Sequence, residues 1–307
     1  MKLSHLRDIL AVAELGSLRA AGRHLNIAQP AITRSIREIE AELGVSLFER
    51  HAKGVRLTTM GTAFVRRADA VRAELQRARD EIEQLKGRST GEVSIALSTA
   101  SCMALMPRTI SLFRQRYPDA VLKISETLLP PIESELVDGT TDLYVGAVDT
   151  DFSSPHLSVE NLIDNERMVI GRRGHPLGEA KTLAELANAR WVRPTLATRG
   201  GTEGEFVDIF HRLGLPQPSI VIHARSALVA LLAVANSDLL TILPRQWIES
   251  EVTRHMLQAI PLDEPIPAVP IGIVRRRDMP LTPMAEHLCD VMRRIATHYS
   301  HRHVQAS

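Results

Sequence analysis

Residues 16–59 constrain the fold of this 307-residue chain more than any other stretch. A short helix is predicted over residues 18–25, with Ser17 as its cap, because a Ser side chain can accept a hydrogen bond from the first helical turn. After a three-residue turn, a second helix is predicted from Gln29 to a stop at Gly44, with Pro30 in its first turn. Two short helices joined by a tight turn are typical of a helix-turn-helix, and an ordinary helical hairpin is the alternative.

The second of these helices has one apolar and one polar face. Ile32, Ile36, Ile39 and Leu43 recur at helical spacing and are expected to face a core. Polar side chains on the other face would enter a major groove, where Gln reads adenine, Arg reads guanine, and Pro or Ala touches a thymine methyl group. The predicted DNA-contacting residues are Ser17, Ala28, Gln29, Pro30, Ala31, Thr33, Arg34, Arg37, Arg50 and Lys53.

The residues after Gly44 favour the DNA-binding interpretation. Leu47 and Phe48 would anchor a two-stranded ribbon, and basic side chains surround Gly54 near its tip. These basic residues are Arg50, His51, Lys53 and Arg56. Such a ribbon is the wing of a winged helix-turn-helix, and it reaches phosphates or the minor groove.

Three motifs in this region, GSLRAA, AQPAITRSIREIEAELGVSLFER and LTTMG, resemble the amino-terminal signature of LysR-type transcriptional regulators. The match is dense over about the first sixty residues. Leu18, Thr33 and Ile39 depart from the usual Phe, Ser and Leu, and only Thr33 bears on sequence preference. The resemblance implies a winged helix-turn-helix, a long linker helix that pairs two subunits, and an effector domain like a periplasmic binding protein.

A heptad pattern supports pairing independently of the resemblance. Residues 59–86 predict one long helix, in which seven apolar side chains follow a 4-3-4-3-4-3 spacing with charged residues on either side. A helix packed on its own domain is the alternative. The seam consists of Phe64, Ala68, Val71, Leu75, Ala78, Ile82 and Leu85. We therefore expect a homodimer through this helix, and the family resemblance implies assembly into a tetramer on double-stranded DNA.

Strands and helices alternate beyond Gly91, which predicts an α/β body, and the strands at 92–97, 120–127 and 143–148 are expected to form a parallel, doubly wound sheet. A late strand near residues 269–274 and a helix from Pro283 suggest that the chain returns to complete the first of two subdomains. The predicted divisions are a DNA-binding domain at 1–58, a linker helix and hinge at 59–89, and an effector domain at 90–307. Within the effector domain, subdomain I spans about 90–162 and 268–307, and subdomain II spans about 163–267.

Two loops are candidates for binding an effector. Hydroxyl groups follow the first strand of the body, and a glycine-rich loop precedes a later helix; both could hold an anion near a helix N-terminus. Simple helix capping is the alternative for the first loop, and a plain loop for the second. The family resemblance places the two loops across a cleft. The predicted effector-binding residues are Ser98, Thr99, Ala100, Ser101, Val148, Thr198, Arg199, Gly200, Gly201 and Thr202.

Charge and cysteine content limit the other function classes. Residues 1–90 hold 16 Lys and Arg against 11 Asp and Glu, whereas the remainder holds 21 against 25, so a basic head precedes a mildly acidic body. Cys102 and Cys289 are the only cysteines, which favours packing roles in a reducing compartment over a redox-sensing pair. Charges interrupt the amino terminus and no apolar run could span a bilayer, so we expect a cytoplasmic protein without a membrane partner.

Motifs for catalysis or metal binding do not occur in the sequence. The chain has no HExxH, CxxC or Walker motif, so neither a metal nor a cofactor is expected, and no catalytic residues are assigned. The sequence thus predicts a DNA-binding transcriptional regulator, not an enzyme, switched by a small anionic organic or aromatic acid. The segments VRRRDMPLTP and EIEQLKGR resemble regulators of aromatic-acid breakdown. A solute-binding protein or an α/β enzyme without a DNA role is the alternative.

Overall fold

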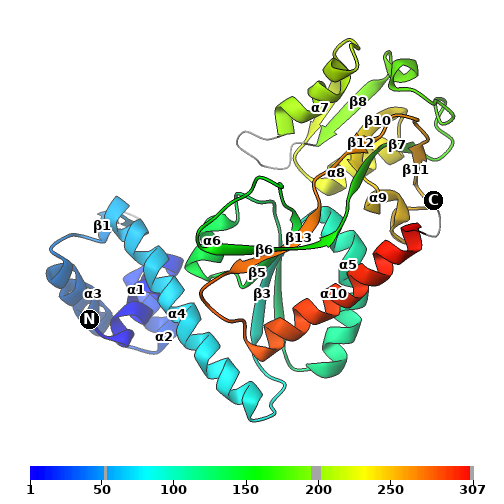
Figure 1. The fold of residues 1–307 in the computed structure, drawn as a ribbon. Helices are drawn as coiled ribbons and strands as arrows, with labels where there is room; N and C mark the ends of the chain where they lie inside the picture. The colour runs from blue at the N-terminus through cyan, green and yellow to red at the C-terminus, as the bar shows by residue number, and fades with distance from the viewer. Residues whose placement is uncertain (52–53, 195–201, 305–307) are drawn as a thin grey trace. The chain divides into compact units, whose positions relative to one another are not determined.

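The computed structural model describes residues 1–51, 54–194 and 202–304, with the backbone alone described at 202–205 and 300–304. The chain divides into two compact units (Figure 1). The first consists of Met1–Glu83 with Asp138–Thr140, and the second of Gln84–Val137 with Thr141–Ser307. Each unit has its own hydrophobic core, so each is described by itself.

The first unit begins with three helices and a two-stranded ribbon, as the sequence predicts. Its elements are α1 (Leu3–Leu15), α2 (Leu18–Leu25), α3 (Gln29–Leu43), β1 (Phe48–His51) and β2 (Gly54–Leu57). The predicted cap is present, because the Ser17 side chain accepts a hydrogen bond from the Ala20 N–H at 3.3 Å. Gly44 ends α3 with a left-handed φ of 69°, a conformation that costs Gly little.

Close backbone contacts hold the helix-turn-helix and the ribbon together. A Cβ on Gly22 would lie 2.7 Å from the Ile27 carbonyl oxygen, so only Gly allows α2 to approach the turn this closely. The core contains Ile32, Ile36 and Ile39, which are at most 6% exposed. Leu43 was predicted to join them, and this was wrong: its side chain is 43% exposed, because it lies in the last turn of α3.

Helix α4 (Thr59–Leu85) carries the predicted heptad seam. Phe64 packs against the core of the first unit, and Ala68 is buried. The first two seam residues are therefore already covered within their own chain. The other five seam residues are exposed, and Leu85 is 70% exposed. The seam is therefore an apolar stripe in the later part of α4.

The second unit contains two sheets. The first has the strand order β4-β3-β5-β13-β6, in which β3, β4 and β5 are parallel and β13 is antiparallel to both neighbours. Helices α5 and α10 cover one face side by side, and α6 packs with the other face (Figure 1). The elements are β3 (Glu92–Leu97), α5 (Thr99–Arg116), β4 (Val121–Glu126), α6 (Glu133–Asp138), β5 (Leu143–Ala147), β6 (Leu157–Ile163), β13 (Ile271–Arg276) and α10 (Pro283–Val304).

The second sheet has the order β11-β7-β10-β8-β9, with β12 paired to β7. Trp191 packs edge-on against Phe206 and Phe210 on one face, while Val192 packs with α8 residues on the other, as alternate strand residues must. The elements are β7 (Glu166–Arg172), η1 (Leu183–Leu186), β8 (Arg190–Pro194), α7 (Thr202–Arg212), β9 (Ser219–Ala224), α8 (Ala227–Ala235), β10 (Leu239–Pro244), α9 (Gln246–Glu249), β11 (Leu257–Ile260) and β12 (Ile266–Pro267).

The α/β body and the return of the chain are confirmed, because β13 lies between β5 and β6 in the first sheet. The predicted parallel arrangement is confirmed for β3, β4 and β5, whereas β13 is antiparallel in the same sheet and β7 is antiparallel to β10 in the other. Strands β6, β11 and β12 and helix α9 were not predicted, and η1 is only a short 3₁₀ helix. Within the described part of the chain, no helix has the length and apolar character needed to cross a bilayer.

Candidate nucleic-acid interface and ligand cavity

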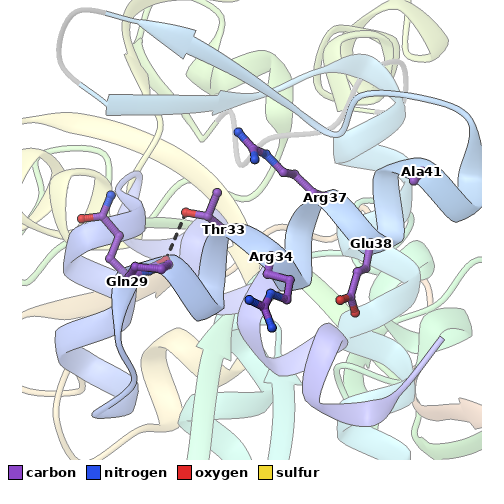
Figure 2. Close-up of a pocket in the computed structure, with 7 residues that line it drawn as sticks. Gln29, Thr33, Arg34, Arg37, Glu38 and Ala41 are labelled. Atoms are coloured by element: carbon purple, nitrogen blue, oxygen red, sulfur yellow. Dashed lines mark hydrogen bonds between the residues drawn. The ribbon is translucent and has the colours of Figure 1, made fainter.

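The exposed face of α3 forms a shallow groove that runs along the helix from Gln29 to Ala41 (Figure 2). Gln29, Arg34 and Arg37 project outward from it, and Thr33 lies between them. The buried side chains Ile32, Ser35, Ile36 and Ile39 occupy the opposite face. This division places the predicted base-reading groups together on one surface of one helix.

The groups on this face differ in their readiness to bind DNA. Among the described residues, neither Arg34 nor Arg37 forms an ion pair, so both guanidinium groups are available to an anion. The Thr33 hydroxyl donates to the Gln29 carbonyl oxygen at 3.0 Å and must rotate to meet a base. Glu38 is the one acidic side chain in the groove, and its Oε2 lies 3.3 Å from His5 Nε2.

The ribbon is attached to α3 by a residue that the sequence reasoning missed. Glu40 Oε1 accepts hydrogen bonds from the Leu47 N–H at 2.7 Å and from the Phe48 N–H at 3.2 Å. This carboxylate fixes the start of β1 relative to α3, and its position one helical turn before Gly44 was the available signal. Arg50 is exposed on β1, whereas Lys53 lies outside the described residues.

A cavity of about 620 Å³ lies between the two sheets of the second unit. Its walls come from the carboxyl ends of β3, β4 and β5 in subdomain I and of β8 and β10 in subdomain II, where ligands of open α/β sheets bind. Most of the lining is apolar, with Phe206, Leu243 and Trp247 among its larger side chains. The polar and charged lining residues are Ser98, Thr99, Asp149, Asp151, Asn165, Arg167 and Arg193.

The structure places the predicted effector residues unequally. Ser98, Thr99 and Ala100 line the cavity. Ser101 and Val148 do not: Ser101 is fully buried beside Ser98, and Val148 belongs to the core around α6. Thr198, Arg199, Gly200 and Gly201 lie outside the described residues, and Thr202 begins α7 with only its backbone described.

Hydrogen bonds explain why the hydroxyl loop contributes less than expected. The Ser98 side chain caps α5 by accepting from the Ser101 N–H at 3.3 Å, and the two Ser Oγ atoms lie 2.9 Å apart. The Thr99 hydroxyl donates to Glu126. The capping alternative therefore describes this loop, and α5 begins at Thr99. The N–H groups of Thr99 and Ala100 precede the first intrahelical bonds and remain the loop's donors.

The sequence reasoning missed the basic side chains of the cavity. Arg167 lies on β7 and Arg193 on β8, and Arg193 is only 6% exposed. A charged residue immediately before Pro194 at the end of an apolar strand was a usable signal for Arg193. Nothing in the local pattern distinguishes Arg167, because its place in the cavity follows from the pairing of β7 with β10.

Polar contacts join the subdomains at the cavity, whose lining includes Asn165 and Val269. Gln246 on α9 donates to Asn165 Oδ1 at 3.2 Å, and Asn165 Nδ2 donates to the Val269 carbonyl oxygen at 3.4 Å. The two segments by which the chain passes between the subdomains, one between β6 and β7 and the other between β12 and β13, are therefore bonded to each other. The Tyr299 hydroxyl on α10 donates to Glu249 on α9. Burial and the neighbouring Glu249 carboxylate raise the pKa of Tyr299, so its proton stays in place.

The two cysteines lack the properties of a redox sensor. Burial, with a contribution from Glu126, raises the pKa of the Cys102 thiol to about 11. Burial raises the pKa of the Cys289 thiol to about 12, and Cys289 lies within the core of subdomain I. Both thiols are therefore protonated at neutral pH, and the thiolate is the reactive form. No cluster of three potential metal ligands occurs among residues that the structure describes.

Similarity to known proteins agrees with this geometry. Residues 3–62 match the family model described as bacterial regulatory helix-turn-helix protein, lysR family, and residues 86–296 match the LysR substrate binding domain. The regulator GbpR of Azospirillum brasilense is 27% identical over 288 residues, covering 93% of this chain and 84% of its own length. GbpR of Rhizobium radiobacter is 31% identical over 242 residues, covering 77% of this chain and 79% of its own. The crystal structure of full-length CbnR complexed with its target DNA has a TM-score of 0.73 at 23% identity and covers 96% of this chain and all of CbnR.

The fold and the two matches define a DNA-binding regulator with an attached small-molecule domain. The chain belongs to the LysR family of bacterial transcriptional regulators. Proteins of this family are DNA-binding regulators and not enzymes, so neither a free solute-binding protein nor an α/β enzyme is favoured. Its partners are double-stranded DNA, a small-molecule effector and further copies of itself.

Proposed function

We propose that this regulator responds to an organic or aromatic acid that binds in the 620 Å³ cavity, and that the bound acid alters how two heads contact an operator. The cavity is the observation that carries this proposal: it has the size of a small-molecule site, a mostly apolar lining and a few charged side chains. The Thr99 and Ala100 N–H groups and the two lining arginines are donors suited to an acid. We propose the cytoplasm as its location, because its target is DNA.

On the DNA side, we propose that the exposed residues of α3 read bases in the major groove. Gln29, Pro30, Thr33 and Arg34 are the proposed base-contacting residues, supported by their common exposed face. The remaining predicted residues would contact the backbone or the minor groove. They are Ser17, Ala28, Ala31, Arg37, Arg50 and Lys53.

We further propose that the exposed part of the α4 seam pairs two copies of the chain. Five apolar side chains at heptad spacing with charged flanks favour a second, identical helix. The proposed divisions are residues 1–58 for DNA binding, 59–89 for the linker and hinge, and 90–307 for the effector domain. The family matches at 3–62 and 86–296 support these divisions, as does the unit boundary after Glu83.

The test combines an operator assay with a ligand screen. DNA upstream of the protein's own gene should be bound in a gel shift at two salt concentrations, with a steep salt dependence and at least ~10³-fold preference over unrelated DNA. A thermal-shift screen of organic acids should find a stabilising ligand, because a ligand at 100 times its Kd adds ~2.7 kcal/mol. That ligand should change the operator shift. Equal affinity for operator and unrelated DNA, or a ligand without effect on the shift, would contradict the proposal.

A further inference from the structure

The charged residues of the cavity are separated by subdomain. Asp149 and Asp151 follow β5 in subdomain I, whereas Arg167 and Arg193 lie on strands of subdomain II. A smaller pocket of about 290 Å³ shares Thr99 with the cavity and repeats this division, with Glu126 from subdomain I and Arg225 from subdomain II. Each wall of the cleft therefore presents one sign of charge.

Arg193 is the most buried of these charged groups. It is 6% exposed and lies near the carboxyl end of the parallel strand β8, between Val192 in the core and Pro194 in the cavity wall. A guanidinium stays ionised even when buried, and removing it from water is costly unless acceptors meet it. Its five N–H donors allow it to keep bonds within the protein and also donate to a ligand.

The apolar part of the cavity adjoins the basic wall. Phe206 and Ile209 on α7 and Trp247 on α9 belong to subdomain II, as do Arg167 and Arg193. A ligand held there can place an acid group on the arginines and a ring or branched chain against these side chains. A second acid group reaching the opposite wall would meet Asp149 and Asp151, where like charges repel.

We propose that the effector is a monocarboxylate with an apolar body, that Arg193, assisted by Arg167, receives its carboxylate, and that Asp149 and Asp151 reject dicarboxylates. This inference rests on the proposed function and names the ligand class and the residues that select it. It also moves the anion contact from the Ser98–Thr99 loop to subdomain II. The loop's hydroxyls are engaged in capping α5 and in bonding Glu126, which is consistent with this assignment.

The experiment compares four compounds on the full-length protein by thermal shift and calorimetry. They are benzoate, 3-phenylpropionate, the neutral analogue benzamide and the dicarboxylate terephthalate. At least one of the two monocarboxylates should bind, and benzamide and terephthalate should each bind at least tenfold more weakly than benzoate or its longer analogue. Failure of both monocarboxylates, or equal binding of benzamide or terephthalate, would overturn the inference. Specific operator binding measured on the same preparation would then show that the regulatory function still stands.

Two variants test the residues. Arg193→Met should weaken monocarboxylate binding at least tenfold and leave benzamide binding unchanged. Arg190→Met is its matched control, because Arg190 is exposed at the opposite end of the same strand, and it should bind like the wild type. The double variant D149N/D151N should bind terephthalate at least tenfold more tightly than the wild type. A folded Arg193→Met protein with wild-type acid affinity would overturn the assignment, as would a double variant that binds terephthalate no more tightly than the wild type. If Arg193→Met does not fold, the double variant and the four-compound comparison on the wild type decide the assignment.

Discussion

The α3 face and the ligand cavity solve two recognition problems in opposite ways. The α3 face is a shallow, exposed surface built from consecutive turns of one helix, and both of its arginines are exposed (Figure 2). The cavity is concave and apolar, is assembled from segments between Ser98 and Val269, and contains a charge that is 6% exposed. Each exposed contact with a DNA phosphate contributes little binding free energy, and salt screens it. Loss of one buried contact costs more binding free energy, and salt changes that cost little. The two regions should therefore respond differently to mutation, salt and oxidation.

The largest effect is expected from a change in the α4 seam. Tight operator binding depends on this seam, whereas effector binding does not. Leu75→Asp would place an unpaired charge in the paired seam, at a cost of several kcal/mol. Light scattering should show monomers, and gel shift should show the loss of tight operator binding, because one head makes half of the contacts. Effector affinity measured by calorimetry should stay within about twofold of the wild type.

Gln76→Asp is the matched control for this change. Gln76 is the next residue on α4, is exposed and lies outside the seam, so the same added charge should leave the dimer intact. A Leu75→Asp protein that remained dimeric would exclude the seam as the pairing surface. Loss of effector binding in that variant would show that the two regions are not separable.

A smaller effect is expected from single arginines of the DNA-binding head. Arg34→Ala should weaken operator binding by ~1–3 kcal/mol and relax the preference at one base pair, because a lost base contact affects one sequence position. Arg50→Ala should weaken all DNA sequences alike and lower the salt slope by about one. Gel shifts with operator variants at several salt concentrations distinguish the two. The same loss of sequence preference from both variants would contradict the proposal that α3 reads bases while the ribbon contacts the DNA backbone or minor groove.

The smallest effect is expected from oxidation. With the pKa of Cys102 raised to about 11, only about one thiol in ten thousand is ionised at pH 7, and the fraction for Cys289 is lower still. Millimolar peroxide at pH 7 should therefore leave both operator and effector affinity unchanged over the time of a binding assay. The thiolate fraction rises with pH, so sensitivity should appear only in strongly alkaline buffer. A peroxide response at pH 7 that vanished in Cys102→Ser would refute this account.

Local features of the fold were predictable because their signals lie close together in the chain. Ser17, Pro30 and Gly44 mark helix ends through bonds that span a few residues, and each acts as predicted. Gly22 is a weak helix former by propensity, but its lack of a Cβ permits the close contact with Ile27. The antiparallel direction of β13 was not predictable, because its pairing with β6 joins residues more than a hundred positions apart.

The candidate sites divide in the same manner. The polar face of α3 follows from helical spacing alone, so the sequence could identify its residues as one surface. The cavity depends on which strands are neighbours, so Arg167 and Arg193 could not be assigned to it. Ser101 is the opposite case, a residue wrongly assigned to the cavity. Its neighbours in the sequence suggest a ligand donor, but in the first turn of α5 its hydroxyl lies against that of Ser98.

The position of β13 also has a consequence for synthesis. A nascent chain that has reached residue 265 contains the whole head, the α4 seam and five of the six strands of subdomain II, but subdomain I still lacks the strand that joins β5 to β6. Domains fold as their sequences emerge, so the head can form well before the sensor is complete. A chain truncated before Ile271 would keep its DNA-contacting face and its pairing helix without a finished cavity. Such a product would compete for operators, and enter mixed dimers with intact copies, without responding to the ligand.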